Sequence, residues 1–324
     1  MIPQAHINSL EKRVLKGGAL DREDALALAE VSGPGVFHVF SSANRVRDHF
    51  RGNKVDLCSI INAKSGACSE DCSFCAQSSR SKAEIQVYPL LGKKEIIERA
   101  NEIKRIGIRR FSLVTSGRKI SGRDLKKLAG MISEIKGLGL SPCASLGLLS
   151  RDEMELLKEA GLERYHHNLE TSERFFPEIC STHSYAEKIE TALAARLAGL
   201  SLCSGGIFGM GETWQDRIDM AFALKELDVD SVPVNFLIPV KGTRLAGREL
   251  LHPLEALKIV SLYRFILPEK QIRICGGRMQ VLGEFHSWIF FAGADGMITG
   301  NYLTTMGRSP RDDFRLIEQF GLVV

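Results

Sequence analysis

The chain has 324 residues, of which 44% are hydrophobic and 25% are charged. These proportions are typical of a globular protein with a substantial core and argue against a disordered chain. The formal net charge is only +4, and Lys and Arg are mixed with Asp and Glu along the whole sequence. Because no basic cluster stands out, nucleic-acid binding is not expected.

Residues 1–18 contain no apolar core of the length found in signal peptides, and the most apolar stretch, residues 287–294, is too short to span a bilayer. We therefore expect a cytoplasmic protein without a membrane segment. Three of the eight cysteines lie within residues 68–75. Because a reducing compartment keeps thiols free, this crowding favours metal binding over disulfides.

The first 50 residues are expected to form a helical extension. Asp21 precedes a run of good helix formers and is a suitable N-cap, with acidic residues in the first turn. A Gly-Pro-Gly sequence at 33–35 should end this helix, and a second helix is expected over roughly residues 36–51. The first strand begins at Val55, so residues 51–324 are predicted to form one domain.

From Val55 onward, short apolar segments alternate with longer amphipathic ones. The candidate strands are residues 55–63, 109–116, 141–147, 164–170, 200–207, 231–238, 271–277 and 296–300. Helical patterns between them include residues 122–139, 184–199, 216–228 and 252–266. Alternating strands and helices imply parallel strands, and eight of them predict an α/β fold of the TIM-type (βα)8 barrel class.

A doubly wound open sheet is the alternative fold, because the same alternation of strands and helices supports it. Its dinucleotide-binding version carries a GxGxxG sequence after the first strand. That sequence is missing after Val55–Ala63, so a nucleotide-binding open sheet is not favoured.

The loop after the first strand supplies three thiols, Cys68, Cys72 and Cys75, in a CxxxCxxC arrangement. A cubane iron–sulfur cluster normally takes four protein ligands, so three thiolates leave one iron open for a small molecule. Structural zinc needs four ligands, commonly in two pairs, and no second pair is nearby. Barrel active sites lie at the C-terminal ends of strands, where this loop emerges. The loop therefore predicts a reactive iron–sulfur cluster.

CxxxCxxC with an aromatic residue, Phe74, before the last cysteine resembles the motif of the radical S-adenosylmethionine superfamily. The resemblance implies a 4Fe-4S cluster on Cys68, Cys72 and Cys75, with S-adenosylmethionine bound to the open iron and Phe74 beside it. It also implies reductive cleavage of the cofactor to methionine and a 5′-deoxyadenosyl radical. The motif does not identify the substrate.

Five segments, in the same order, are similar to the biotin synthase family. They are NAKSGACSEDCSFCAQSSR, AGLERYHHNLETS, LCSGGIFGMGET, PVNFLIPVKGT and the closing LTT at 303–305. The resemblance runs from about residue 50 to 320. It implies sulfur insertion between two unactivated carbons of dethiobiotin, with a second iron–sulfur cluster in the barrel as the sulfur source. It further implies a reducing protein such as flavodoxin or ferredoxin, and a homodimer.

His166, Asn168 and Glu170 alternate along one predicted strand and so share one face of it. The resemblance implies that Asn168 and Glu170 bind S-adenosylmethionine, with the acid on the ribose hydroxyls. It places His166 and Asn235 near the substrate. Asn168 and Glu170 could instead be polar filling of the barrel.

By the same resemblance, Arg196 pairs with the carboxylate of the cofactor, although a surface arginine is its alternative interpretation. Gly205 and Gly206, together with Gly209 and Gly211, would let the backbone approach the cofactor closely. Ordinary turns are the alternative role for these glycines.

Cys143 and Cys203 match family ligands of the auxiliary cluster, and Arg273 matches an unusual arginine ligand. The remaining family ligand is a cysteine on the second strand, where this sequence has Ser112. Cys275 lies two residues beyond Arg273, so both side chains should project to the same side. We therefore expect Cys143, Cys203 and Cys275 to hold the auxiliary cluster, with Arg273 or Ser112 near the remaining iron.

Both a two-iron and a four-iron auxiliary cluster fit this ligand set. Cys58 and Cys180 match no family ligand and are expected to be structural. Two alternative functions stay open. One is another radical enzyme of the same branch, similar to a hydrogenase maturase or to methylornithine synthase, and the other is a non-catalytic iron–sulfur protein.

Overall fold

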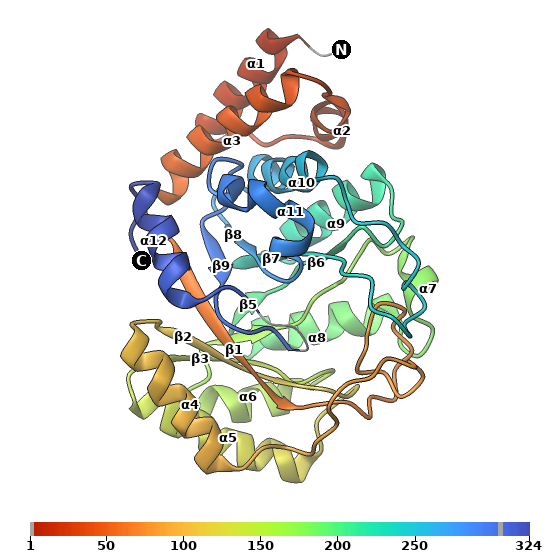
Figure 1. Cartoon of the computed structure of the whole chain (residues 1–324), viewed down its shortest axis with the longest axis vertical. Coiled ribbons are helices and arrows are strands. Elements are labelled where there is room, and N and C mark those ends of the chain that lie inside the picture. Colours follow the sequence, from red (N-terminus) through yellow and green to blue (C-terminus); the bar gives the residue numbers. More distant parts are fainter. Residues whose placement is uncertain (1–2, 304–306) are drawn as a thin grey trace.

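The structure is a computed structural model that describes residues 3–303 and 307–324. Two of the three residues in the closing LTT sequence, at 304 and 305, therefore lie outside the described residues. The chain begins with three helices, α1 (Gln4–Leu15), α2 (Arg22–Glu30) and α3 (Gly35–Arg51). Figure 1 shows them gathered at one end of the molecule, with α3 packed against α10.

The predicted boundaries of the N-terminal helices agree with the structure. Asp21 is the N-cap of α2, and its side chain accepts a hydrogen bond of 2.8 Å from the backbone N–H of Asp24. This bond satisfies one of the free donors at the start of the helix. The helix ends at Glu30, before the Gly-Pro-Gly sequence.

A closed barrel of parallel strands follows these helices. The strands are β1 (Asp56–Lys64), β2 (Arg110–Thr115), β3 (Ser141–Ser145), β4 (Arg164–His166), β5 (Ser201–Cys203), β6 (Gly206–Phe208), β7 (Ser231–Phe236), β8 (Gln271–Ile274) and β9 (Gly296–Ile298). Their order is β5-β4-β3-β2-β1-β9-β8-β7-β6. The pair Cys203 and Ser231 joins β5 to β7 and closes the ring, so the TIM-type barrel is confirmed over the open sheet.

Two predicted strands differ from the structure. The segment predicted at 164–170 is a strand only over β4 (Arg164–His166), and residues 167–170 lie beyond its end. Residues 200–207 form two short strands, β5 and β6, with a break at Ser204 and Gly205. Both strands pair with β7, so together they occupy a single position in the barrel.

Helices cover the outside of the barrel and connect its strands (Figure 1). They are α4 (Lys93–Ile106), α5 (Gly122–Gly137), α6 (Arg151–Glu159), α7 (Phe176–Ile179), α8 (Tyr185–Leu197), α9 (Trp214–Glu226), α10 (Pro253–Ile266), α11 (Arg278–Leu282), the 3-10 helix η1 (Gly283–Ile289) and α12 (Pro310–Gln319). Among the described residues, none of the helices has both the length and the apolar character needed to cross a bilayer.

A buried ion pair ties the end of the barrel to the N-terminal helices. Asp295, just before β9, accepts hydrogen bonds from Arg264 of α10 and from the backbone N–H of Ile272, at 2.5 and 2.7 Å. Its second oxygen accepts from Arg51 of α3 at 2.7 Å. The side chains of Arg264 and Asp295 are 0% and 1% exposed. One carboxylate therefore connects four elements.

Replacing Asp295 with asparagine should leave the Arg264 guanidinium buried without its counter-charge. Breaking a buried ion pair in this way costs about 3–5 kcal/mol. Urea unfolding should therefore show a loss of that size in the free energy of unfolding for Asp295→Asn. The matched control is Asp48→Asn on α3, whose carboxylate is 69% exposed and should change stability little. Equal stability of the two variants would contradict the structural role of Asp295.

Candidate active site

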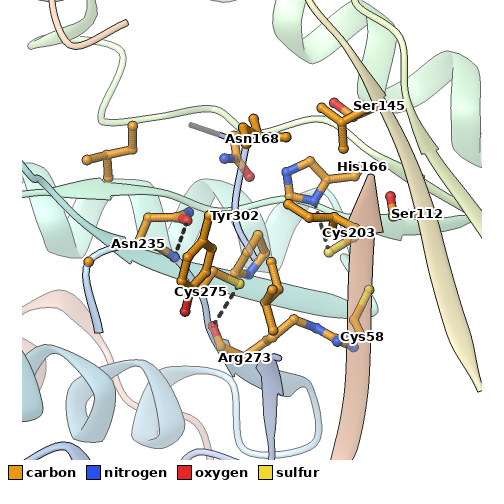
Figure 2. A pocket seen from close by; sticks show the side chains of 18 of the residues that line it. Cys58, Ser112, Ser145, His166, Asn168, Cys203, Asn235, Arg273, Cys275 and Tyr302 are labelled. Carbon is orange, nitrogen blue, oxygen red and sulfur yellow. Dashed lines mark hydrogen bonds between the residues drawn. The ribbon is translucent and has the colours of Figure 1, made fainter. Parts of the chain in front are cut away.

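A cavity of about 370 Å³ lies inside the barrel and reaches the loops at the C-terminal ends of the strands. Its lining includes eleven of the predicted site residues, which are Phe74, Cys75, Ser112, Cys143, His166, Asn168, Glu170, Cys203, Asn235, Arg273 and Cys275. Figure 2 shows many of these side chains converging on one space. The barrel therefore brings together residues that are far apart in the sequence, from Phe74 to Cys275.

The three predicted cluster thiols lie on one compact loop, residues 65–79, directly after β1. The backbone of Cys68 is bonded to the second half of the loop, donating to Gln77 at 3.1 Å and accepting from Ser79 at 2.8 Å. Burial raises the pKa of the Cys75 thiol to about 11, and the nearby Cys68 thiol contributes to the increase. The fold of the loop thus brings the Cys68 and Cys75 thiols close together.

A second segment, residues 179–183, holds this loop in place. The backbone N–H of Ser73 donates to the carbonyl of Ile179 at 2.8 Å, and the Asp71 carboxylate accepts from the backbone N–H of Ser181 at 2.9 Å. Asp71 and Ser73 flank Cys72. The position of this central thiol is therefore set by contacts with a distant part of the chain.

Cys180 lies in this second segment, and sequence analysis missed its relation to the cluster loop. Its Sγ atom is 3.8 Å from that of Cys72 and 3.3 Å from Nδ1 of His183. The ligand atoms of Cys72, Cys180 and His183 all lie within 4.8 Å of one another. A separation of 108 residues between the two cysteines hid this contact from any local pattern.

The predicted alternation on β4 and the residues after it is confirmed, because His166, Asn168 and Glu170 all line the cavity. The amide of Asn168 donates to Glu170 at 3.3 Å. The other amide atom, Oδ1, is buried and has no hydrogen-bond partner among the described residues. A buried polar atom without a partner is costly, so Oδ1 is available to a donor on a ligand.

Glu170 has two unusual features. Its φ angle is +74°, a left-handed conformation that residues other than glycine rarely adopt. Burial raises the pKa of its carboxyl group, and the positive charge of Lys188 only partly opposes this increase. A carboxylate in strained backbone at a cavity wall is typical of a functional position.

Lys188 lies beside Asn168, near Glu170, and sequence analysis did not select it. It lies near the start of α8, is 7% exposed, and its ammonium donates to the carbonyl of Asn168 at 3.0 Å. A signal was available, because Ser184 is the N-cap of α8 and helices of such a barrel begin at the C-terminal ends of the strands.

The prediction for Arg196 is corrected by the structure. Arg196 lies near the C-terminal end of α8 and pairs with Asp228 and Asp230, which precede β7. Eight residues separate it from Lys188, a distance of about 12 Å along a helix. Because α8 runs antiparallel to the strands, Arg196 lies at the opposite end of the barrel from the cysteine loop.

The structure gives Gly205 and Gly206 a role in backbone packing, and their predicted contact with the cofactor stays a prediction. A Cβ atom on Gly205 would lie 2.1 Å from the carbonyl oxygen of Pro233, and one on Gly206 would lie 2.4 Å from that of Glu170. Glycine is required here because backbone segments of the barrel approach one another. The N–H groups of Gly209 and Gly211 donate to Glu212 at 2.9 and 3.1 Å, which is consistent with a turn.

Asn235 uses its side chain to join two backbone segments at the cavity wall. Its Nδ2 donates to the carbonyl of Gly206 at 3.1 Å, and its Oδ1 accepts from the N–H of Gly276 at 3.0 Å (Figure 2). The amide is therefore held in one orientation while it faces the cavity.

Four cysteines line the inner end of the cavity. These inner cysteines are Cys58, Cys143, Cys203 and Cys275, on β1, β3 and β5 and just after β8. His166 Nδ1 is 3.4 Å from the Cys203 Sγ atom. Burial raises the pKa of Cys203, but the charge and hydrogen bond of His166 outweigh this effect and lower it to about 6. Cys203 is therefore poised to act as a thiolate ligand.

The inner end of the cavity has an excess of positive charge. Asp56 accepts from Arg273 at 2.7 Å and from Arg110 at 3.4 Å, while Arg164 bonds only neutral partners, Ser201 and Gln271. Three guanidinium groups thus face one carboxylate.

One atom of this group lacks a partner. Nη1 of Arg273 is buried and has no hydrogen-bond partner among the described residues. Thiolates around an anionic iron–sulfur cluster would supply both the missing negative charge and the missing acceptor. The residues at this inner end therefore fit such a cluster.

Family models match two successive parts of the chain. Residues 63–224 match the Radical SAM superfamily, and residues 233–323 match the Biotin and Thiamin Synthesis associated domain. The first match contains the cysteine loop and the β4 residues. The chain is therefore a radical S-adenosylmethionine enzyme.

Curated relatives define the family within this class. Biotin synthase of Thermodesulfovibrio yellowstonii is 55% identical over 289 residues, covering 89% of this chain and 91% of the relative. Biotin synthases of Pelobacter propionicus and Pelotomaculum thermopropionicum are 50% and 51% identical, with 96% to 99% of each chain covered. The chain belongs to the biotin synthase family, as the five sequence segments predicted.

Solved structures confirm the fold. Methylornithine synthase has a TM-score of 0.86 at 25% identity, with 97% of this chain and 96% of that chain covered. The hydrogenase maturase HydG of Carboxydothermus hydrogenoformans has a TM-score of 0.83 at 19% identity, with 99% and 79% covered. Since the biotin synthases are far more similar in sequence, the two alternative functions are not supported.

Glu170→Gln should stabilise the protein before it is loaded with iron and cofactor. Burial raises the pKa of this acid above its value in the unfolded chain, so its ionisation costs stability at high pH and nothing below about 4.5. Each unit of that increase corresponds to about 1.4 kcal/mol. Urea unfolding should show the variant to be more stable than the parent at pH 8, with a smaller difference at pH 5.

The control for this measurement is Glu249→Gln, which changes an exposed glutamate and should not alter stability at either pH. A Glu170→Gln variant that is less stable than the parent at pH 8 would contradict the argument, because it would mean that the folded protein favours the charged carboxylate.

Proposed function

We propose that this chain converts dethiobiotin to biotin by radical insertion of sulfur, with S-adenosylmethionine as the source of the radical. One observation carries this proposal. The same cavity is lined by Cys75 and Glu170 near its mouth and by Cys143, Cys203 and Cys275 at its inner end. A radical source and a sulfur source can therefore face one substrate between them.

In this proposal Cys68, Cys72 and Cys75 hold the 4Fe-4S cluster, and S-adenosylmethionine occupies the adjacent part of the cavity. When bound, the pair supplies a carbon radical that can remove hydrogen from a saturated carbon, which an ordinary side-chain base cannot do. Phe74 lines the same part of the cavity and covers the cofactor.

The polar groups around this space fit the cofactor one by one. The unpartnered Oδ1 of Asn168 can accept a hydrogen bond from the amino group of S-adenosylmethionine. The ammonium of Lys188 is close enough to affect the pKa of Glu170, and it can attract the carboxylate of S-adenosylmethionine. Glu170 can bind the ribose hydroxyls. Lys188 thus takes the role that the sequence resemblance had assigned to Arg196.

Dethiobiotin would lie deeper in the cavity, between the cofactor and the inner cysteines. His166 and Asn235 line this middle part, and the hydrogen bonds of Asn235 hold its amide still. A site inside the barrel that orients both reactants also keeps the radical away from solvent and from side reactions.

Cys143, Cys203 and Cys275 hold the auxiliary cluster that donates sulfur, with Arg273 or Ser112 near the remaining iron. The proposal is supported by the position of all five residues in the lining of the same cavity and by the uncompensated charge of the guanidinium groups. Both a two-iron and a four-iron cluster fit the three thiolates.

We further propose a reducing compartment such as the cytoplasm, which eight free cysteines favour. The electron donor would be a small reducing protein such as flavodoxin or ferredoxin, and the active form a homodimer. Residues 51–324 would form the catalytic domain and residues 1–50 a helical extension of it.

The decisive experiment incubates anaerobically reconstituted, reduced protein with S-adenosylmethionine and dethiobiotin. Mass spectrometry should detect both 5′-deoxyadenosine and biotin. Alanine at Cys68, Cys72 or Cys75 should abolish both products, because each variant loses a ligand of the cluster. Deoxyadenosine without biotin would mean a different substrate, and neither product from cluster-loaded protein would contradict the proposal.

Lys188→Met should weaken the binding of S-adenosylmethionine to the cluster-loaded protein by roughly 10- to 100-fold, since a charge-assisted hydrogen bond contributes about 1.5–3 kcal/mol. Arg196→Met is the matched control and should bind the cofactor like the parent. Equilibrium dialysis at constant iron content would measure both. Loss of affinity in the Arg196 variant alone would restore the assignment made from the sequence.

Cys275→Ala should retain the first cluster and lose iron and sulfide from the second. It should therefore cleave S-adenosylmethionine and form no biotin, because the sulfur source is gone. Iron and sulfide analysis, together with the two product assays, would measure this separation. An unchanged auxiliary cluster would exclude Cys275 as a ligand.

A further inference from the structure

Cys58 is the fourth of the inner cysteines, and the ligand set proposed above gives it no role. It lies on β1, where Cys58 and Ile60 alternate toward the cavity. In the barrel register Cys58 pairs with Arg110 of β2 and with Ile298 of β9. Its thiol therefore enters the cavity from a side that none of the other inner cysteines occupies.

The surroundings of Cys58 are polar and charged, in contrast with those of a packing cysteine. Figure 2 shows the Cys58 side chain beside the guanidinium of Arg273. The charges of Arg273, Arg110 and Asp56 all act on its thiol. A buried cysteine that serves only as a small hydrophobic residue is normally enclosed by apolar side chains. Cys58 instead faces the group of charges that needs an anionic partner.

The four inner cysteines form a ring around the inner end of the cavity, because they come from β1, β3 and β5 and from the residue just after β8. All four are buried. In the barrel register Cys143 lies opposite Ser112 of β2, and Cys203 lies opposite His166 of β4. Four buried thiols that line one cavity are a suitable set of soft ligands for a common metal centre.

Ser112 is the weaker candidate for the remaining position in the ligand set. It lies on β2 opposite Ile60, one inward-facing position along the barrel from the pair of Cys58 and Arg110. Iron in sulfide clusters prefers soft thiolate ligands to a neutral hydroxyl group. The thiol that the second strand lacks is thus present on the neighbouring first strand.

We propose that Cys58 is the fourth thiolate ligand of the auxiliary iron–sulfur cluster, completing a set with Cys143, Cys203 and Cys275. This inference rests on the auxiliary cluster of the proposed function. Arg273 is then a hydrogen-bond donor to the cluster, using the Nη1 group that has no partner among the described residues, and Ser112 is left outside the ligand set.

The test isolates the auxiliary cluster in the full-length chain. Alanine at Cys68, Cys72 and Cys75 removes the first cluster, and the resulting triple variant is reconstituted with iron-57 and sulfide under anaerobic conditions. Into this background either Cys58→Ala or Cys58→Ser is introduced. The matched control is Cys180→Ala, which removes a buried cysteine that is outside the inner ring.

Cys58→Ala should lose at least half of the iron and sulfide that the triple variant retains. Cys58→Ser should keep more of the cluster, and its Mössbauer spectrum should show part of the iron shifted to the higher isomer shift of oxygen-ligated iron. The triple variant and the Cys180→Ala control should have the same iron content and show only sulfur-ligated iron.

Folding of the Cys58 variants is checked with the first three cysteines intact, where each should still load the first cluster and form 5′-deoxyadenosine. Iron, sulfide and Mössbauer spectra unchanged by Cys58→Ala would overturn the role of Cys58 and leave the proposed function standing. A triple variant that binds no cluster with all four inner cysteines present would overturn both proposals.

Discussion

The inner end of the barrel depends on the ionic contacts of Asp56. This carboxylate accepts from Arg273 and Arg110, and burial, which would raise its pKa, is outweighed by these two positive charges, which lower it. The contacts fix two guanidinium groups against the strands but leave the site with more positive than negative charge. Unpaired buried charges are costly, so these guanidinium groups favour an anionic partner in the cavity. The ionic contacts of Asp56 thereby leave the inner end of the cavity with a positive charge that favours an anionic cluster.

The strand β4 and the residues that follow it connect this inner end to the mouth of the cavity. His166, at the end of β4, contacts Cys203, while Asn168 and Glu170 follow two and four residues later beside the cysteine loop. Backbone hydrogen bonds hold the residues after β4, because the N–H of His167 donates to Cys203 at 2.9 Å and that of Glu170 donates to Gly205 at 3.1 Å. The spacing between the two regions is therefore set by the backbone and not by flexible side chains. A reaction that must place a radical source and a sulfur source on either side of one substrate benefits from such a rigid spacer.

The remaining structure supports this arrangement from outside. Residues 179–183 hold the cysteine loop, and Asp295 links the last strand to α3 and α10. The end of the chain returns to the start of the barrel, where the N–H of Val55 donates to the carbonyl of Val323 at 2.7 Å. The first and last parts of the chain therefore stabilise β1, the strand that carries Cys58 and leads into the cysteine loop.

The sequence by itself determined the features that depend on local patterns. Alternating apolar segments predicted the barrel strands, the CxxxCxxC spacing identified the radical enzyme class, and period-two alternation correctly placed His166, Asn168 and Glu170 on the cavity wall. The tertiary structure alone decided that Lys188, and not Arg196, lies beside the cofactor residues, where it contacts the carbonyl of Asn168, because the direction of α8 depends on the barrel topology. It also decided that Gly205 and Gly206 serve backbone packing, and that Cys58 and Cys180 lie beside predicted ligands. These facts depend on which strands become neighbours when the barrel closes, and no local pattern contains that register.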